Sequence, residues 1–277
     1  MKISSCLLVL LISLFSIAGA NAAPTSFYLI VIDKTGSMTS TRSTTGNSRF
    51  QDAITQAEGD LLEAINEAQS VGGDLQVSVA TFNSTIGYQQ LLDFGNPTSA
   101  QTVLNNLRSN RPGARTNLAD SLCTGADELF DESTTDSYKR VIGFYTDLDE
   151  NQSSGSCSGS DWMSKVIQKF FSGFPNPVFN VTLFATVDDL TVSSMLMGIG
   201  KVVKESDPQR KEMSGLYEEL GLVAPAQLLN IKDEVRFMMT LAGYTGGAVL
   251  GIADTQDDPV IDTDNSDCGR FFPCPNQ

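Results

Sequence analysis

Three oxygen-bearing side chains follow an apolar run near the start of the chain. The run Phe27–Ile32 is apolar throughout, and Asp33, Thr35 and Ser37 come after it at alternate positions. An apolar run that ends at a turn predicts a strand buried on both faces, as in a parallel sheet. Open α/β sheets bind ligands at the carboxyl ends of such strands. One carboxylate and two hydroxyls, with Gly36 allowing a tight loop, therefore suit a hard cation such as Mg²⁺.

The segment Asp33-Lys-Thr-Gly-Ser37 resembles the D-x-[ST]-G-S motif of von Willebrand factor A (vWA) domains, the metal-ion-dependent adhesion site. That family carries further site residues on two later loops. Thr116, which follows a Pro-Gly turn and precedes a predicted helix, is similar to the threonine of the family's G-x-T-x-x-x-x-x-L segment. Asp147 ends another apolar run and is similar to the aspartate of the family's T-D-G segment, with Leu148 in place of the glycine.

The resemblance implies a metal site for Mg²⁺ or Mn²⁺ formed by Asp33, Thr35, Ser37, Thr116 and Asp147. The two hydroxyls of Thr35 and Ser37 would bind the ion directly, and Thr116 would bind it directly or lie close by. The two carboxylates would act partly through water. One ligand position would stay open for an Asp or Glu carboxylate of a protein partner. The implied function is thus metal-dependent protein binding and not enzymatic catalysis.

Strand patterns and amphipathic helix patterns alternate along the chain. Apart from the first run, strands are expected at 75–82, 89–94, 140–147 and 178–187, and helices at 50–68, 97–109, 117–130, 162–171 and 231–245. This alternation predicts an α/β fold, in which a doubly wound, mainly parallel sheet is flanked by helices on both faces. The segment Leu241-Ala-Gly-Tyr-Thr-Gly-Gly247 resembles the family's L-A-x-x-T-G-G end, where a helix stops at glycines before the final strand.

The two ends of the chain differ in composition from the predicted domain. Residues 1–22 combine Lys2, an apolar core and a small-residue site ending at Ala22, which predicts a signal peptide and a secreted or periplasmic protein. The vWA-like domain is expected over 25–254, with a helical insertion at 188–230 that exceeds what the family needs. Residues 255–277 are predicted to form an acidic tail. No second long apolar run occurs, so we predict no membrane span.

Charge and composition exclude several classes of function. The formal net charge is −15, which argues against nucleic acid as a partner because phosphate binding needs a basic face. The chain has no histidine. This excludes mechanisms that depend on a Ser-His or Cys-His pair and zinc sites of the HExxH type.

Four cysteines remain outside the predicted signal peptide, namely Cys123, Cys157, Cys268 and Cys274. An even number in an exported chain indicates disulfides, and three connectivities are possible. We favour Cys123–Cys157 with Cys268–Cys274, because the first bridge would tie the helix after Thr116 to the loop after Asp147. A zinc site made of cysteines alone is a weaker alternative, since the spacing lacks a CxxC pair.

Two other functions stay open. One is a metal-free vWA scaffold that binds its partner through the 188–230 insertion. The other is a Mg²⁺-dependent phosphatase-like enzyme, because Asp33-Lys-Thr-Gly-Ser-Met-Thr39 also resembles the phosphorylation motif of cation-pumping ATPases and their haloacid-dehalogenase-like relatives. That class needs a downstream lysine and a further acidic motif, which we do not find in the sequence.

Overall fold

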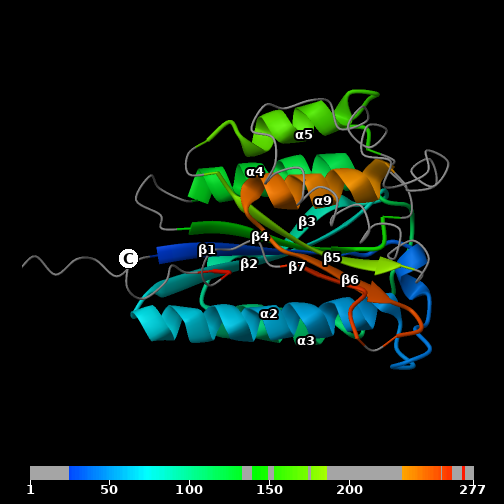
Figure 1. The fold of residues 1–277 in the computed structure, drawn as a ribbon, viewed down its shortest axis with the longest axis horizontal. Coiled ribbons are helices and arrows are strands. Elements are labelled where there is room, and N and C mark those ends of the chain that lie inside the picture. The colour runs from blue at the N-terminus through cyan, green and yellow to red at the C-terminus, as the bar shows by residue number, and fades with distance from the viewer. Residues whose placement is uncertain are drawn as a thin grey trace, which may run out of the picture.

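The computed structural model describes seven stretches of the chain: 25–132, 139–148, 153–173, 176–185, 233–256, 258–263 and 270–271. The predicted signal peptide, the 188–230 insertion and the Cys268–Cys274 pair lie outside these described residues. The described part forms a seven-stranded sheet with the order β3-β2-β1-β4-β5-β6-β7, and helices lie on both of its faces (Figure 1).

Most strands of the sheet run parallel. The strands are β1 (Thr25–Asp33), β2 (Asp74–Asn83), β3 (Gly87–Gly95), β4 (Lys139–Thr146), β5 (Val178–Ala185), β6 (Val249–Ala253) and β7 (Ile261–Thr263). The inner strands pair in parallel, whereas β3 and β7 pair antiparallel at the two edges. The predicted fold class, a doubly wound and mainly parallel α/β sheet, is therefore confirmed.

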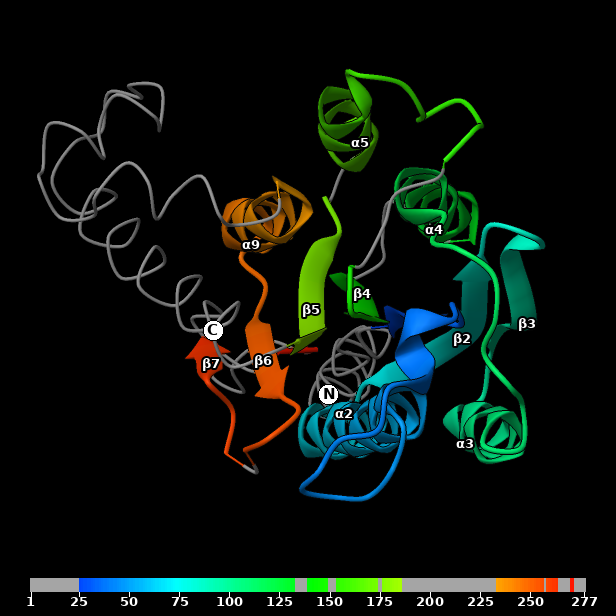
Figure 2. The same ribbon diagram turned by 90° about the vertical axis from the view of Figure 1, so that its right-hand side faces the viewer.

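The helices divide into two layers. They are α2 (Arg49–Val71), α3 (Pro97–Leu107), α4 (Leu118–Glu132), α5 (Trp162–Phe170) and α9 (Asp233–Thr245), with the short 3₁₀ helix η1 (Ser37–Thr39). Helices α2 and α3 cover one face of the sheet, and α4, α5 and α9 cover the other (Figures 1 and 2). Each layer has its own apolar core against the sheet, which explains why β1 and β4 are apolar on both faces.

Helix α2 begins at a residue that the sequence indicates. Ser48 is the N-cap, and it forms a reciprocal capping box with Gln51. The helix ends at Gly72, which has a positive φ of 64°. Helix α5 lacks such a cap: Asp161 occupies the N-cap position but makes no capping bond, and its carboxylate pairs with Lys165 at 2.9 Å.

The C-terminal segment also contributes to the domain. Beyond β7, the side chain of Phe271 is buried and packs on Tyr28 with ring centroids 4.7 Å apart. The Glu67 carboxylate accepts hydrogen bonds from the backbone N–H groups of Arg270 and Phe271, at 2.8 and 2.7 Å. The hydroxyl of Ser26 donates to the carbonyl of Phe271 at 3.1 Å. Part of the segment predicted as an acidic tail therefore belongs to the sheet and the core.

The two glycines after α9 are required for different structural reasons. Gly246 has a φ of 74°, in the left-handed region that favours glycine. A Cβ on Gly247 would lie 1.9 Å from the carbonyl oxygen of Phe179. We expect Gly247→Ala to destabilise the protein by about 3 kcal/mol or more, since backbone must move, and Gly246→Ala by only about 1 kcal/mol. Urea unfolding of both variants checks this order, and equal costs would contradict it.

Strand order places the predicted site at one edge of the sheet. Strand β1 lies between β2 and β4. The chain continues from β1 to β2 and β3 on one side, and β4 and the later strands are added on the other side, so the strand order reverses at β1. Ligands of open α/β sheets bind at such a switch point, outside the carboxyl ends of the strands. Ile32 of β1 pairs with Tyr145 of β4, so the residues that follow them, including Asp33 and Asp147, lie at the same edge of the sheet.

Candidate metal centre

Asp33 is fully buried at the end of β1, and both of its carboxylate oxygens accept hydrogen bonds. The backbone N–H of Thr35 donates to Oδ1 at 2.9 Å, and the hydroxyl of Thr146 donates to Oδ2 at 2.6 Å. Thr146 is not among the predicted site residues, although its place directly before Asp147 in the T-D segment is a signal that points to it. These two bonds hold the Asp33 carboxylate in a fixed orientation.

The predicted hydroxyls connect the two acidic loops. The hydroxyl oxygens of Thr35 and Ser37 are 3.1 Å apart, and the Ser37 hydroxyl donates to Oδ1 of Asp147 at 3.0 Å. Four of the five predicted site residues, Asp33, Thr35, Ser37 and Asp147, are thus brought together at the switch point.

The fifth residue, Thr116, lies on a loop that is bound to the first one. The Gly36 N–H donates to the carbonyl of Ala114 at 2.8 Å, and the Gly113 N–H donates to the carbonyl of Lys34 at 3.1 Å. Thr116 itself is buried. The structure therefore places the Thr116 segment directly beside the Asp33–Ser37 loop, as the resemblance implies.

Leu148, which stands where the resembled T-D-G motif has glycine, adopts a backbone geometry that favours glycine. Its φ is 50°, in the left-handed region that a non-glycine residue rarely occupies. Its N–H donates to the hydroxyl of Thr146 at 3.1 Å, and its side chain is buried in the core below α4 and α5. The turn after β4 thus has the form that glycine favours, while the leucine side chain anchors the turn to the core.

Two further contacts fix the loop after β4. The predicted disulfide joins Cys123 of α4 to Cys157. The carboxylate of Asp120, also on α4, accepts hydrogen bonds from three backbone N–H groups, those of Ser154, Gly155 and Cys157. Because α4 begins just after Thr116, these contacts tie the second and third site loops to one helix, which favours a preorganised site.

Arg49 is a site neighbour that the sequence analysis missed. Its guanidinium donates to Oδ2 of Asp147 at 3.0 Å and forms two hydrogen bonds with the carboxylate of Asp254, which follows β6. Arg49 is the first residue of α2, where a cation is disfavoured by the helix dipole. That mismatch is a sequence signal that Arg49 needs acidic partners.

The charges at the site are incompletely balanced. Burial raises the pKa of Asp33 to about 7, and the neighbouring Asp147 carboxylate adds to the shift. Among the described residues, no cationic side chain forms an ion pair with Asp33. Those residues contain no cluster of three or more His, Cys, Asp or Glu side chains suited to a metal, so hydroxyls must supply part of any ligand set. An all-oxygen set with excess negative charge fits a small divalent cation.

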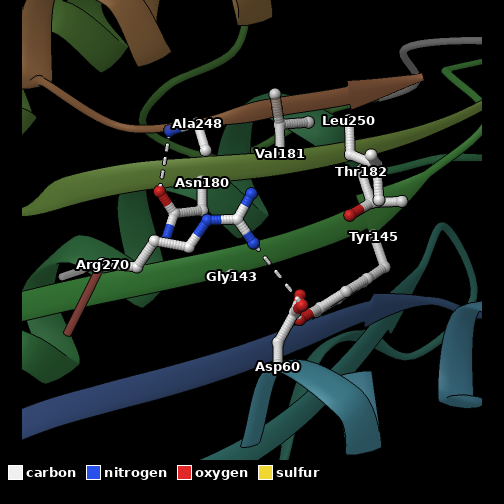
Figure 3. Close-up of a pocket in the computed structure, with 9 residues that line it drawn as sticks. All are labelled: Asp60, Gly143, Tyr145, Asn180, Val181, Thr182, Ala248, Leu250 and Arg270. Carbon is white, nitrogen blue, oxygen red and sulfur yellow. Dashed lines mark hydrogen bonds and ion pairs between the residues drawn. The ribbon is translucent and has the colours of Figure 1, made fainter. Parts of the chain in front are cut away.

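A small cavity lies away from this edge, between the sheet and α2 (Figure 3). Its volume of about 10 Å³ is room for roughly one water molecule. The hydroxyl of Tyr145 donates to Asp60 at 2.7 Å and lies 2.8 Å from the hydroxyl of Tyr28. The Arg270 guanidinium is 3.7 Å from Asp60, whose pKa is raised by burial. We interpret this region as a polar network within the core and not as a ligand site.

Comparison with known proteins supports the vWA resemblance. Residues 28–150 match the family model described as the von Willebrand factor type A domain. This segment includes all five predicted site residues. Domains of the vWA family generally act in protein interactions. None of the curated protein sequences compared with the chain matches it.

Several solved structures share features of the fold at low sequence identity. The SpRpn10 VWA domain is 9% identical with a TM-score of 0.42, and the match covers 57% of this chain and 75% of that one. BatB from Bacteroides thetaiotaomicron is 14% identical with a TM-score of 0.40, covering 59% and 68%. The D319A mutant of the PilB minor pilin from Streptococcus sanguinis is 18% identical with a TM-score of 0.36. That match covers 45% of this chain and only 30% of the pilin.

Proposed function

We propose that this protein is an exported interaction module that binds an acidic residue of a protein partner through Mg²⁺ or Mn²⁺. The proposal rests on the vWA match, which points to protein interaction as the general function. Metal dependence is supported by one observation above the others. The hydrogen-bonded chain Thr35–Ser37–Asp147 runs beside the buried Asp33, so four oxygen-bearing side chains meet at the switch point. In the described residues, no helix is long and apolar enough to cross a membrane.

Each site residue has a role in this proposal. The hydroxyls of Ser37 and Thr35 would bind the ion directly, together with Thr116 or a group close to it. The carboxylates of Asp33 and Asp147 would balance the charge, partly through water. The protein supplies too few ligands to complete an octahedral set, so one position is available for a carboxylate of the partner. A bound cation reverses the local field, which would otherwise repel an acidic ligand.

A second candidate is a metal-free scaffold, and the position of Arg49 favours it. The guanidinium already pairs with Oδ2 of Asp147, whose side chain is fully buried. A fixed cation at this carboxylate reduces the negative charge available to a metal ion. In this alternative, Arg49 stabilises the loops permanently and another surface, such as the 188–230 insertion, binds the partner.

Calorimetric titration of Mg²⁺ and Mn²⁺ into chelator-treated protein separates the two candidates. We expect saturable binding at one site in the wild type and its loss in Asp33→Ala and in Asp147→Ala, because each variant removes a carboxylate that balances the ion. Asp74→Ala is the matched control, since Asp74 is an exposed carboxylate at the start of β2, on the opposite edge of the sheet. Unchanged binding in the site variants would refute the assigned site. A wild type that binds no metal at millimolar concentration would favour the metal-free scaffold.

A further inference from the structure

The basic residues of this acidic protein are unevenly distributed. The segments 34–51 and 108–117 contain Lys34, Arg42, Arg49, Arg108, Arg111 and Arg115, and neither segment contains an Asp or Glu. These are six of the 18 Lys and Arg residues in a chain with 33 Asp and Glu residues. Both segments lie at the carboxyl edge of the sheet, and one of them carries Thr35 and Ser37. The cations therefore gather around the candidate metal centre.

Three of these six cations take part in ion pairs that are largely shielded from solvent. Arg42 pairs with Asp52 at 2.5 Å, Arg49 pairs with Asp147 and Asp254, and Arg108 pairs with Glu58. Lys34, Arg111 and Arg115 are distinguished by their exposure: Arg111 and Arg115 are exposed, and Lys34 is half-buried. We call Lys34, Arg111 and Arg115 the basic rim.

The backbone beneath the basic rim is held in place. The two bonds that join Lys34 and Gly36 to the 113–114 turn fix the first loop against the second. The Arg115 N–H donates to the hydroxyl of Ser84 at 2.9 Å, and the Arg115 carbonyl accepts from the Ser84 N–H at 2.6 Å. The loop between α3 and α4 consequently runs beside the β2–β3 hairpin, at the edge that faces the viewer in Figure 2.

The same hairpin presents an apolar side chain. Ile86 is 54% exposed, and it is one of four large hydrophobic side chains that are strongly exposed in the described part of the chain. Its backbone N–H and that of Thr85 donate to Oδ1 of Asn83, at 2.8 and 3.0 Å, so the turn is rigid. Ile86 and the basic rim thus lie on neighbouring loops that are hydrogen-bonded to one another, at the same edge of the sheet as Asp33 and Ser37.

We propose that the basic rim and Ile86 bind an acidic peptide segment of the partner protein, in which an apolar residue lies among several carboxylates. This rests on the proposed function, because one of those carboxylates would occupy the metal centre. The neighbouring carboxylates would lie against the basic rim, and the apolar residue would cover Ile86. The charge complementarity is local, since the rest of the protein is acidic and would repel such a segment.

Fluorescence anisotropy with a labelled decapeptide of glutamates around one central leucine tests this inference. In Mg²⁺ and low salt, we expect Arg111→Gln to weaken binding about threefold to fivefold, and the double variant with Arg115→Gln about tenfold, with smaller effects at high salt. Lys169→Gln is the matched control, because Lys169 is a partly exposed cation on α5 that pairs with Asp127. We expect Ile86→Ser to weaken binding of the peptide that contains leucine and to leave binding of an all-glutamate peptide unchanged.

The outcomes separate this inference from the proposed function. If the calorimetric Mg²⁺ affinity stays the same in Arg111→Gln while peptide affinity falls, the basic rim acts on the partner and the inference is supported. If Arg111→Gln and Lys169→Gln bind the peptide equally well, the inference is overturned even though metal binding stands. If the wild type binds no Mg²⁺, the proposed function fails. The inference about the basic rim would still be supported if the peptide bound in the presence of chelator and Arg111→Gln weakened that binding. Absence of peptide binding in both conditions overturns the inference.

Discussion

Replacing Arg49 with methionine is expected to lower the free energy of unfolding of the metal-free protein by about 3–5 kcal/mol, the cost of breaking a buried ion pair. The side chains of Arg49 and Asp147 are 13% and 0% exposed, so water cannot solvate the abandoned carboxylate. In the variant, the Asp147 carboxylate would still lie next to Asp33 but would have lost its ion pair with Arg49. Methionine keeps much of the apolar stem of arginine, so the loss comes mainly from the charge.

The same variant is expected to bind Mg²⁺ about tenfold more tightly or better, because a fixed positive charge has been removed from the neighbourhood of the ion. Saturating Mg²⁺ should therefore recover part of the lost stability. Urea unfolding with and without Mg²⁺ measures both effects. Lys169→Met is the control, since its pair with Asp127 is 32% and 50% exposed and should contribute less than about 1 kcal/mol. Equal stability of Arg49→Met and the wild type would show that the pair does not hold the loops together.

The sequence was sufficient to predict that the loops carrying Asp33 and Asp147 meet at one edge of the sheet. Asp33 and Asp147 each end an apolar run, and a parallel sheet places the ends of such runs at one edge. The α/β alternation and the Cys123–Cys157 bridge also agree with the structure. These features depend on local patterns, namely the period of apolar residues and the order of elements, which a single sequence contains. Binding of a metal at the site stays a prediction.

The contacts that escaped prediction are long-range. The partners of Arg49 lie 98 and 205 residues away along the chain, and nothing near Arg49 in the sequence identifies them. Phe271 is an aromatic residue within an acidic segment, and its backbone is hydrogen-bonded to Glu67 and Ser26, which belong to other elements. The left-handed backbone of Leu148 is a similar case. A leucine gives no local indication of this conformation, and only the family pattern with glycine at that position points to it.

Replacing Asp33 with asparagine is expected to abolish Mg²⁺ binding and to stabilise the metal-free protein above neutral pH. The pKa of Asp33 is about 7 in the folded protein because of burial and the nearby Asp147, against about 3.9 in an unfolded chain. The folded state therefore holds a proton that the unfolded state has lost, and stability falls as pH rises from about 4 to about 7. The full penalty, present above pH 7, has an upper limit of about 4 kcal/mol.

Asparagine removes this penalty and can still accept the hydrogen bond from the N–H of Thr35. We expect Asp33→Asn to unfold at a higher urea concentration than the wild type at pH 8, and the gain to disappear as the pH falls below about 4, where Asp33 becomes protonated in both states. Asp74→Asn is the matched control, because it makes the same change at an exposed carboxylate at the start of β2. Lower stability of Asp33→Asn at pH 8 would mean that the carboxylate is structurally required. Higher stability combined with lost metal binding would show that the buried charge is retained for binding, at a cost to the stability of the fold.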